Sequence, residues 1–391
     1  MKTKGLTICF LSIVFVLAAL NVGNAILALD PFVTKFVRHE SVQDVHSAKE
    51  LIQSVDASYN DNFKTKMAFV ELHGLTRKLI GSRQYNSVLR LNNGYLTYQY
   101  GDADVELYAE NITQLDQYVK SKGKEFLYVA VPFKICPLDQ EEQLPAGVTD
   151  DSNANQDEML SILQENDVAF YDLRNVMAQE IDDWYAAFFK TDQHWKPETA
   201  FWAYGKMAEL FHDRYGYEID DLSTDLSNYN VEHMEDWFLG SQGKKTGIVY
   251  AGVDDFDLIY PRFETEMTVD IPVHDEHRTG TFRDVMFKDS NLEKDYYNIN
   301  NYAAYTGGDY PLCIQKNDSA VNDKKILVLK DSFTVAFQPY LSFLFKEVHV
   351  IDLRHYDGSV EEYIDEVDPD LVMVFYTSSM MSYPEAYVFD R

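Results

Sequence analysis

The sequence contains few cysteines, and this scarcity excludes two classes of small domain. Among 391 residues, only Cys9, Cys136 and Cys313 are cysteines. A disulfide-stapled scaffold and a cysteine-rich zinc module both need more of them. Cys136 and Cys313 either pair with each other or remain as two buried thiols, and the sequence leaves both alternatives open. With 46% apolar residues, the chain is too apolar for a disordered protein and long enough for one large domain with additions or for two domains.

Basic residues are also scarce. The chain has 34 Lys and Arg against 64 Asp and Glu, which gives a formal net charge of −30, and the acids are spread along its length. Clusters of Lys and Arg bind the phosphates of nucleic acids, so no nucleic-acid partner is expected. Such a charge is typical of a soluble protein that works outside the cytoplasm or beside acidic polymers.

Residues 1–29 have the layout of a secretory leader. Lys2 and Lys4 precede an uncharged, strongly apolar run, and the first acid is Asp30. The cleavage site is weak, and the run is about long enough to span a bilayer. We therefore predict an extracytoplasmic protein, which is either anchored by an uncleaved N-terminal segment or secreted after removal of a signal peptide.

The rest of the chain predicts a helical segment followed by an α/β domain. Residues 30–85 form the N-terminal helical segment, since apolar residues recur there at helical spacing. The α/β domain spans 86–391. It opens on a hairpin with strands at 88–91 and 95–98, joined by Asn92-Asn93-Gly94, because Asn-Gly is a strong turn signal between apolar runs.

Fully apolar strands in the C-terminal third indicate a buried, mainly parallel sheet. The predicted strands are 126–131, 168–173, 326–330, 348–353 and 371–376, and the predicted helices are 111–122, 155–165, 197–211, 334–345 and 359–366. Strands that alternate with helices and are apolar on both sides belong to a doubly wound sheet that helices cover on both faces. Residues 213–310 are rich in Asp, Tyr and Gly and predict an inserted β/loop region, which would serve as a lid or a substrate wall.

Two short segments contain residue types that suit acyl-group chemistry. Asp192 and His194 are one residue apart in a predicted loop, so both can face one cleft, where the Asp would orient the imidazole and leave its other nitrogen free as a base. Ser332 follows the strand 326–330, and ligands of open α/β sheets bind at the carboxyl ends of strands. The structural alternatives are a capping Asp beside a buried His, and a helix-capping Ser. The G-x-S-x-G motif of α/β-hydrolases is absent.

In combination, these segments resemble the DHHW family, relatives of the alginate O-acetyltransferase proteins with an SGNH hydrolase-like fold. The resemblance covers about residues 60–391. Four segments carry it: Thr191-Asp192-Gln193-His194-Trp195 for T-D-H-H-W, Lys330-Asp331-Ser332-Phe333 for K-D-S-[YF], Val348 to Arg354 (with Pro339 upstream) for a strand ending in Asp-x-Arg, and Val131-Pro132 followed by Lys134 for P-x-K. Gln193 departs from the family pattern, which has His at this position.

The resemblance implies an SGNH-like (flavodoxin-like) fold and a Ser-His-Asp triad, with Ser332 as nucleophile, His194 as general base and Asp192 as its orienting partner. It further implies extracytoplasmic O-acetyl transfer to a polysaccharide acceptor through an acyl-serine, with a membrane-bound O-acyltransferase partner supplying the acyl donor and no cofactor. A carbohydrate esterase with the same triad, or a non-catalytic glycan-binding or assembly protein, remains as an alternative.

Further residues are candidates for binding an oxyanion or the substrate. Besides the Ser332 N–H, adjacent glycines in the segment Tyr305 to Asp309 allow a backbone N–H to approach a ligand, so Gly308 and Tyr305 are candidates. Arg354 is expected to pair with a carboxylate near the sheet end. His274-Asp275-Glu276-His277 looks like a metal cluster but lacks a third ligand nearby, so no metal is expected. Gly240 to Lys245 lacks the P-loop pattern and predicts a solvated turn.

Overall fold

The structure is a computed structural model that describes residues 66–390 together with Ser12 and Phe15. The chain divides after His73, and the second unit, Gly74–Arg391, holds the sheet and the candidate site. The predicted leader at 1–29 and most of the predicted helical segment lie outside the described residues. Helix α3 (Lys66–Leu79) falls within that segment. Within the described part of the chain, no helix is both long and apolar enough to cross a bilayer.

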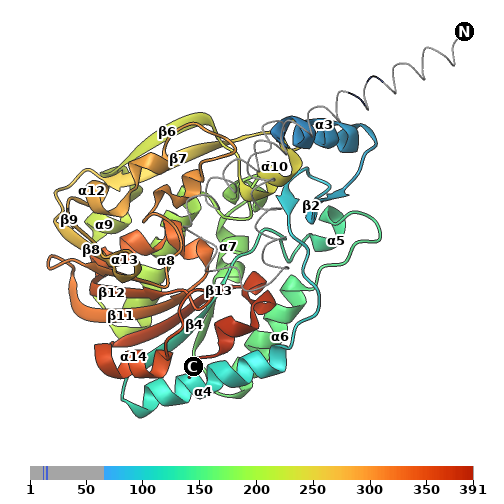
Figure 1. Cartoon of the computed structure of the whole chain (residues 1–391). Helices are drawn as coiled ribbons and strands as arrows, with labels where there is room; N and C mark the ends of the chain where they lie inside the picture. The colour runs from blue at the N-terminus through green and yellow to red at the C-terminus, as the bar shows by residue number, and fades with distance from the viewer. Residues whose placement is uncertain (1–11, 13–14, 16–65, 391) are drawn as a thin grey trace, which may run out of the picture. The chain divides into compact units, whose positions relative to one another are not determined.

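An eight-stranded sheet lies at the centre of the described part of the second unit (Figure 1). Its parallel strands, in sheet order, are β5 (Phe170–Asp172), β4 (Glu125–Val131), β13 (Leu371–Thr377), β11 (Asn322–Lys330) and β12 (Phe345–Ile351). Each overlaps a strand predicted from the sequence. The last strand, β13, lies between β4 and β11, so the carboxyl ends of these three strands are adjacent. The segments that follow Val131, Lys330 and Thr377 therefore lie next to one another, at the carboxyl ends of the parallel strands.

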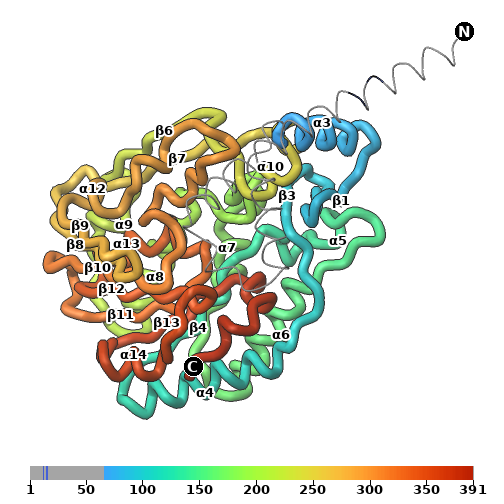
Figure 2. The backbone as a smooth tube through the Cα atoms, viewed as in Figure 1, coloured from blue at the N-terminus to red at the C-terminus, as the bar shows by residue number. Residues whose placement is uncertain are grey.

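Helices cover both faces of the parallel strands. Along β13, Leu371, Met373 and Phe375 enter one hydrophobic core, and the alternating residues enter the other. One face carries α4 (Val105–Ser121), α6 (Ser152–Glu165) and α14 (Val360–Val367), and the other α7 (Leu173–Glu180), α8 (Pro197–Tyr215) and α13 (Gln338–Leu344), as the chain path shows (Figure 2). Burial on both faces explains why β13 and residues 326–329 of β11 are apolar at every position.

The inserted region extends the sheet in antiparallel fashion. Strands β8 (Met267–Ile271) and β9 (Glu276–Gly280) follow β10 (Leu312–Lys316), which pairs antiparallel with β12. Strands β6 (Tyr229–Phe238) and β7 (Asp254–Pro261) form a separate two-stranded ribbon. The burial of β8 alternates along the strand, as expected for a strand with one face on the core.

The predicted hairpin is confirmed as part of a small three-stranded sheet. Strand β2 (Val88–Arg90) pairs with β3 (Leu96–Thr97), and β1 (Gln84–Tyr85) pairs with β2 on its other side. Asn86 and Ser87, which join β1 to β2, both have left-handed backbone conformations with φ of 52° and 63°. That pair of values is typical of a type I′ turn, whose twist suits a two-residue hairpin.

Both described cysteines are buried and free. Cys136 and Cys313 form no disulfide, so the structure has the free-thiol alternative. Burial raises the pKa of both thiols, that of Cys313 to about 12. Neither is therefore a reactive thiolate at neutral pH.

Candidate active site

Ser332 stands where β11 passes into the short 3₁₀ helix η7 (Ser332–Ala336). The residue before it, Asp331, caps this helix by accepting a hydrogen bond from the Phe333 N–H at 2.9 Å. The other carboxylate oxygen of Asp331 accepts hydrogen bonds from the N–H and the hydroxyl of Thr377, at 2.8 and 2.7 Å. Asp331, not Ser332, is thus the capping residue, and it ties the ends of β11 and β13 together beneath Ser332.

The imidazole of His194 lies between Ser332 and Asp192. His194 Nε2 is 2.7 Å from Ser332 Oγ, and His194 Nδ1 is hydrogen-bonded to Asp192 Oδ1. The same Oδ1 accepts the His194 backbone N–H at 3.2 Å. Residues 138 positions apart in the sequence therefore form one hydrogen-bonded chain. Such a chain can move a proton from the hydroxyl to Nε2 while the carboxylate stabilises the resulting imidazolium.

The second oxygen of Asp192 is held by the inserted region. Asp192 Oδ2 accepts the N–H of Ser241 at 2.6 Å, at the first residue of α10 (Ser241–Thr246). The preceding residue, Gly240, approaches so closely that a Cβ there would lie 2.2 Å from the Asp192 Cβ. Only glycine fits this position. The prediction of a solvated turn at 240–245 is wrong, because this segment is a helix start buried against Asp192.

Asp254, at the start of β7, binds the residues that come directly before Asp192. Its two oxygens accept the N–H groups of Lys190 and Thr191 at 2.7 and 2.8 Å, and the Thr191 hydroxyl at 2.6 Å. The Thr191 hydroxyl in turn accepts the Gly240 N–H at 2.9 Å. The inserted region thus holds in position the loop that carries Asp192 and His194.

The surroundings of Asp192 keep its carboxyl ionised. Burial by itself would raise the pKa of Asp192, but His194, the Ser241 N–H and the charge of Lys134 lower that pKa well below its ordinary value. A buried carboxylate that stays charged can orient the imidazole and balance a positive charge on it.

Three aromatic side chains fix the plane of the imidazole and the start of η7. The ring of Tyr302, in η6 (Asn301–Ala304), stacks on His194 with centroids 4.1 Å apart and 13° between the planes. The Tyr302 hydroxyl and the Trp195 indole N–H both donate to the carbonyl of Phe333, at 3.0 and 2.9 Å. The ring of Phe333 lies 5.1 Å from His194. His194 can therefore rotate little.

Lys134 is a buried amine next to the loop that carries Asp192 and His194. Its Nζ donates to the carbonyls of Leu96 and Asp192, the first at 2.6 Å, and its side chain is fully buried. Burial lowers the pKa of Lys134 to about 7, against the opposing charges of Asp192 and Asp254. Lys134 therefore ties the β3 hairpin to the loop that carries Asp192.

Replacing Lys134 with Met is expected to change how stability depends on pH. Between pH 7 and 10.5 the unfolded chain binds one more proton at Lys134 than the native protein, so wild-type stability rises with pH, by at most about 5 kcal/mol over this window. Lys134→Met should lose this rise, and it should also be less stable, because two buried carbonyls lose their donor.

Urea unfolding at several pH values measures the effect. Lys346→Met is a suitable control, because the Lys346 side chain is 42% exposed, and it should keep the wild-type slope. An unchanged slope in Lys134→Met would show that Lys134 is charged across this range.

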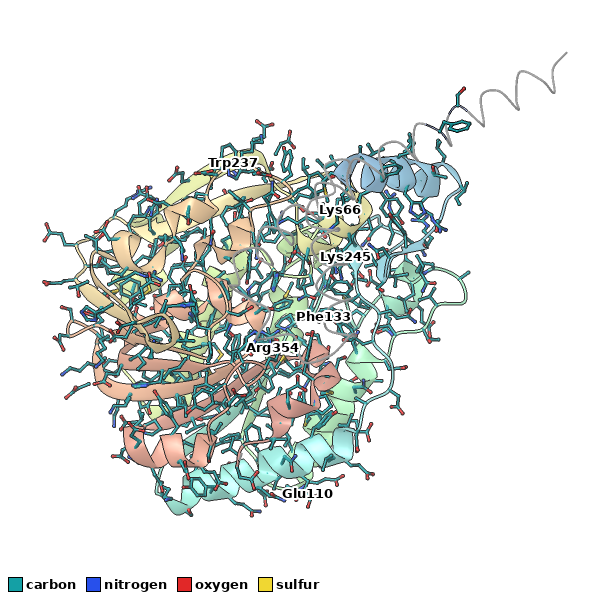
Figure 3. All side chains as sticks on the ribbon, in the orientation of Figure 1. Lys66, Glu110, Phe133, Trp237, Lys245 and Arg354 are labelled. Atoms are coloured by element: carbon teal, nitrogen blue, oxygen red, sulfur yellow. The ribbon has the colours of Figure 1, made fainter. Side chains whose placement is uncertain are left out.

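Ser332 opens into a pocket of about 400 Å³. Its lining residues are Ser87, Tyr98, Tyr100, Gln193, Ser241, Lys245, Asp331, Ser332, Arg354, Ser379 and Tyr383. Arg354 pairs with Asp352 through Nε and a terminal nitrogen, at 2.9 and 2.5 Å, as expected for a residue at the sheet end. Figure 3 marks Arg354 and Lys245, the two cations of this pocket.

The structure does not bring Tyr305 and Gly308 to this pocket. Tyr305 is fully buried, and its hydroxyl donates to the Asp257 carbonyl at 3.1 Å and accepts the Ile259 N–H at 3.0 Å. The Gly308 N–H donates to the Tyr305 carbonyl at 3.3 Å within a turn. Both residues therefore have structural contacts, and an oxyanion role for them gains no support from the geometry.

The segment 274–277 has no metal-site geometry. His277 Nδ1 is 2.5 Å from Asp270 across the β8–β9 pair, and His274 packs edge-on against Tyr310. Among residues 66–390, no group of three or more His, Cys, Asp or Glu side chains is arranged to hold a metal ion.

Sequence reasoning missed several residues of the site. No local pattern distinguishes Gly240, Ser241, Asp254 or Tyr302, and each lies at least 48 positions from the residue it supports. For Lys134, the sequence indicates only its place in the P-x-K motif. The single local signal was the Gly240-Ser241 pair, whose glycine permits close approach to another segment.

Comparisons with known proteins agree with this fold. Residues 89–226 match the model of the family described as SGNH hydrolase-like domain, acetyltransferase AlgX. No protein with a curated description matches the chain. The solved structure of Bacillus cereus PatB1 is 23% identical with a TM-score of 0.64, and the similarity covers 78% of this chain and 99% of PatB1.

Two further solved structures are similar. PatB1 with a sulfonyl adduct is 22% identical with a TM-score of 0.63, over 78% of this chain and 98% of that one. A DHHW family protein from Eubacterium siraeum is 19% identical with a TM-score of 0.59, over 78% of this chain and 94% of that one. The SGNH hydrolase-like fold and the resemblance to the DHHW and alginate acetyltransferase proteins are thus confirmed.

Proposed function

We propose that this SGNH hydrolase-like protein is an extracytoplasmic O-acetyltransferase that modifies a polysaccharide through an acyl-serine. The observation that carries the proposal is the hydrogen-bonded chain from Ser332 through His194 to Asp192 beside an open pocket. The match of residues 89–226 to an acetyltransferase domain family supports the reaction type.

In the first half-reaction, Ser332 Oγ attacks the carbonyl carbon of the acyl donor. The hydroxyl proton passes to His194 Nε2, 2.7 Å away, and the bond to the donor's leaving group breaks as that group takes the proton from His194. Asp192, whose pKa is lowered by its neighbours, balances the charge on the imidazolium.

In the second half-reaction, a sugar hydroxyl gives its proton to His194 Nε2 and attacks the acyl-serine. The ester bond to Ser332 breaks, Ser332 regains its proton from His194, and the sugar leaves as its acetyl ester. Negative charge on the carbonyl oxygen is expected to face the Ser332 N–H, because the first N–H groups of a helix lack intrahelical acceptors. Arg354 lines the same pocket, where its guanidinium is paired with Asp352.

The donor and the location form part of the same proposal. The basic and then apolar residues 2–29 support export or anchoring outside the cytoplasm. Acetyl groups made inside the cell must then cross the membrane, so a membrane-bound O-acyltransferase is the proposed supplier.

Acetyl transfer can be tested directly with an artificial donor. The protein is incubated with 4-nitrophenyl acetate and a panel of oligosaccharides, and products are analysed by mass spectrometry. Acetylated oligosaccharide formed in competition with acetate is the expected result. Release of acetate alone with every acceptor and a rate independent of acceptor concentration would indicate a carbohydrate esterase, in which water resolves the acyl-serine.

A further inference from the structure

Tyr302 contacts both partners of the proton transfer between Ser332 and His194. Its ring lies nearly parallel to the imidazole of His194, with 13° between the planes and 4.1 Å between the centroids. Its hydroxyl donates to the carbonyl of Phe333, the residue that follows Ser332, at 3.0 Å. One side chain of the inserted region therefore fixes the imidazole relative to the segment that carries the nucleophile.

The surroundings of η6 hold the Tyr302 ring in this position. The side-chain amides of Asn301, in η6, and of Asn291, ahead of it, donate to backbone carbonyls at 2.8 to 3.1 Å. The ring of Phe189 meets the Tyr302 ring edge-on, with 6.2 Å between the centroids and 88° between the planes. The Tyr302 ring therefore has little freedom to turn away from His194.

Tyr302 is a neutral phenol in the folded protein. It is 2% exposed, and burial, together with the charges of Asp331 and Asp192, holds the pKa of Tyr302 well above its ordinary value. The hydroxyl therefore keeps its proton and its hydrogen bond to the Phe333 carbonyl. The face of such a ring is electron-rich, whereas its edge is electron-poor.

His194 presents its ring to this electron-rich face when it becomes positively charged. In both proposed half-reactions His194 takes up a proton at Nε2 and becomes an imidazolium. An aromatic face stabilises a cation, most strongly where water is excluded, and the His194 side chain is only 12% exposed. Asp192 meets the imidazole at Nδ1, in the plane of the ring, whereas Tyr302 meets it through the face. The two residues therefore stabilise the imidazolium through different contacts.

We propose that Tyr302 is a positioning residue for acyl transfer, which keeps the imidazole of His194 in line with Ser332 and Asp192 and stabilises its protonated form through the ring face. This inference rests on the proposed function, because it needs Ser332 and His194 to react. The ring of Tyr302 acts on the charge of the imidazole, and the hydroxyl acts on the position of the segment after Ser332. Removing the ring and removing the hydroxyl should therefore have different effects.

Other charges near the triad also influence its dependence on pH. Besides Asp192 itself, the charged groups that act on Asp192 or Tyr302 come from several elements: Asp331 before η7, Asp309 in the turn after η6, Lys134 after β4, and Lys244 on α10. A substitution that changes only the ring of Tyr302 leaves all of these groups in the protein. A change in the pH dependence of such a variant therefore reports the contact of that ring with the imidazole.

The pH dependence of Ser332 labelling tests the proposal. The rate constant for reaction of full-length protein with a fluorophosphonate probe is measured by intact mass from about pH 5 to pH 8, the range in which an imidazole changes charge. Tyr302→Leu loses both contacts, so its highest rate constant should fall by roughly ten- to hundredfold. Its acid limb, where the rate constant falls as the pH is lowered, should move to lower pH by roughly half a unit to one and a half units, because the imidazolium loses its aromatic partner.

Tyr302→Phe separates the hydroxyl from the ring. Its acid limb should stay at the wild-type pH, because the ring still faces the imidazole. Its rate constant should fall by about two- to tenfold, since the Phe333 carbonyl loses one donor but keeps the Trp195 indole N–H.

Fluorine substitution separates the charge of the ring face from the shape of the ring. Phenylalanines that carry one, two or three ring fluorines are introduced at position 302 by amber suppression and compared with Tyr302→Phe. Each added fluorine withdraws electrons from the face, so the acid limb should move stepwise to lower pH. An acid limb that stays in place through this series would overturn the proposal, whether or not Tyr302→Leu folds.

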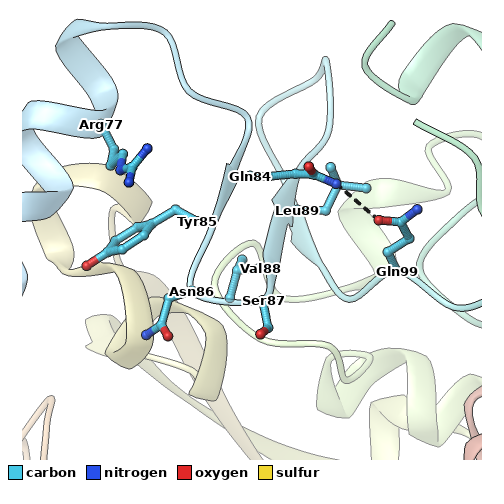
Figure 4. Close-up of a pocket in the computed structure, with 8 residues that line it drawn as sticks. All are labelled: Arg77, Gln84, Tyr85, Asn86, Ser87, Val88, Leu89 and Gln99. Atoms are coloured by element: carbon cyan, nitrogen blue, oxygen red, sulfur yellow. Dashed lines mark hydrogen bonds between the residues drawn. The ribbon is translucent and has the colours of Figure 1, made fainter. Parts of the chain in front are cut away.

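Tyr85→Leu is the matched control. Tyr85 lines another pocket, of about 480 Å³, at the β1–β2 turn (Figure 4), and its ring meets that of Tyr250 edge-on at 6.2 Å. It is not among the described residues that line the pocket of Ser332, so Tyr85→Leu should keep the wild-type rate constant and acid limb. A Tyr302→Leu protein that behaves like Tyr85→Leu would also overturn the proposal. If the proposed function itself fails, the probe leaves wild-type Ser332 unlabelled, whereas failure of the Tyr302 assignment alone leaves wild-type labelling intact.

Discussion

Replacing Ser332 with Ala is expected to lower turnover of 4-nitrophenyl acetate by about 10⁴-fold or more and to abolish formation of an acetylated protein. The hydroxyl oxygen is the atom that forms the ester, and Ser332 Oγ lies 2.7 Å from His194 Nε2. Without this oxygen no acyl-serine can form, even when the ester substrate is bound and contacts the pocket's hydrogen-bond donors. Intact mass spectrometry and nitrophenol release measure the two effects independently.

A second serine of the pocket provides a matched control. Ser379 lines the same pocket, but its hydroxyl is hydrogen-bonded to Thr377 at 2.6 Å. Ser379→Ala is expected to acquire one acetyl group, as the wild type does. Formation of an acetyl adduct on Ser332→Ala at the wild-type rate would disprove the assignment of Ser332 as the nucleophile. Loss of the adduct only in Ser379→Ala would identify Ser379 as the nucleophile.

The substitution Asp192→Asn is expected to lower the same activity by about 10³- to 10⁴-fold with little change in the fold. In the native protein one carboxylate oxygen faces His194 Nδ1 and the other faces the Ser241 N–H. An Asn amide has a single oxygen. Turned toward Ser241, it presents its NH₂ to Nδ1, which places the imidazole proton on Nε2 and blocks acceptance of the Ser332 proton. Turned toward His194, it opposes its NH₂ to the Ser241 N–H.

Comparison with a neighbouring residue separates this effect from general disturbance of the loop. Gln193 lies between Asp192 and His194 and lines the pocket, but it takes no part in the hydrogen-bonded chain. Gln193→Ala is expected to stay within about tenfold of the wild type, as is usual for a residue outside the proton path. Circular dichroism melting of both variants checks the fold. An Asp192→Asn protein as active as Gln193→Ala would show that Asp192 does not set the imidazole tautomer.

The inserted region has a larger part in the site than a lid or a wall would have. Asp254 holds Thr191, the start of α10 holds Asp192, and Tyr302 stacks on His194. Removing this region would take away the contacts that orient the imidazole and leave Ser332 with an unpositioned base. The three hydrogen-bonded residues thus depend on contacts from a segment without any recognisable motif.

Local sequence was sufficient for the sheet and for the chemical groups. Residues 326–329 and 371–376 are apolar at every position, which is typical of strands buried on both faces, so β11 and β13 could be predicted from their own sequences. Asn93-Gly94 predicted the hairpin because a tight turn depends on adjacent residues alone. Asp192, His194 and Ser332 were recognised by residue type, spacing and position after a strand.

Tertiary structure alone decided what surrounds those groups. The contact of Ser241 with Asp192 joins residues 49 positions apart, and the stacking of Tyr302 on His194 depends on how η6 packs against the catalytic loop. Tyr305 and Gly308 were predicted near Ser332 from local flexibility, yet side-chain packing places Tyr305 in the core. Strand burial and turn geometry are properties of neighbouring residues, whereas the position of one loop against another depends on how every element between them packs. For that reason the sequence determined the fold class and the candidate triad, and only the folded chain determined the residues that support the triad.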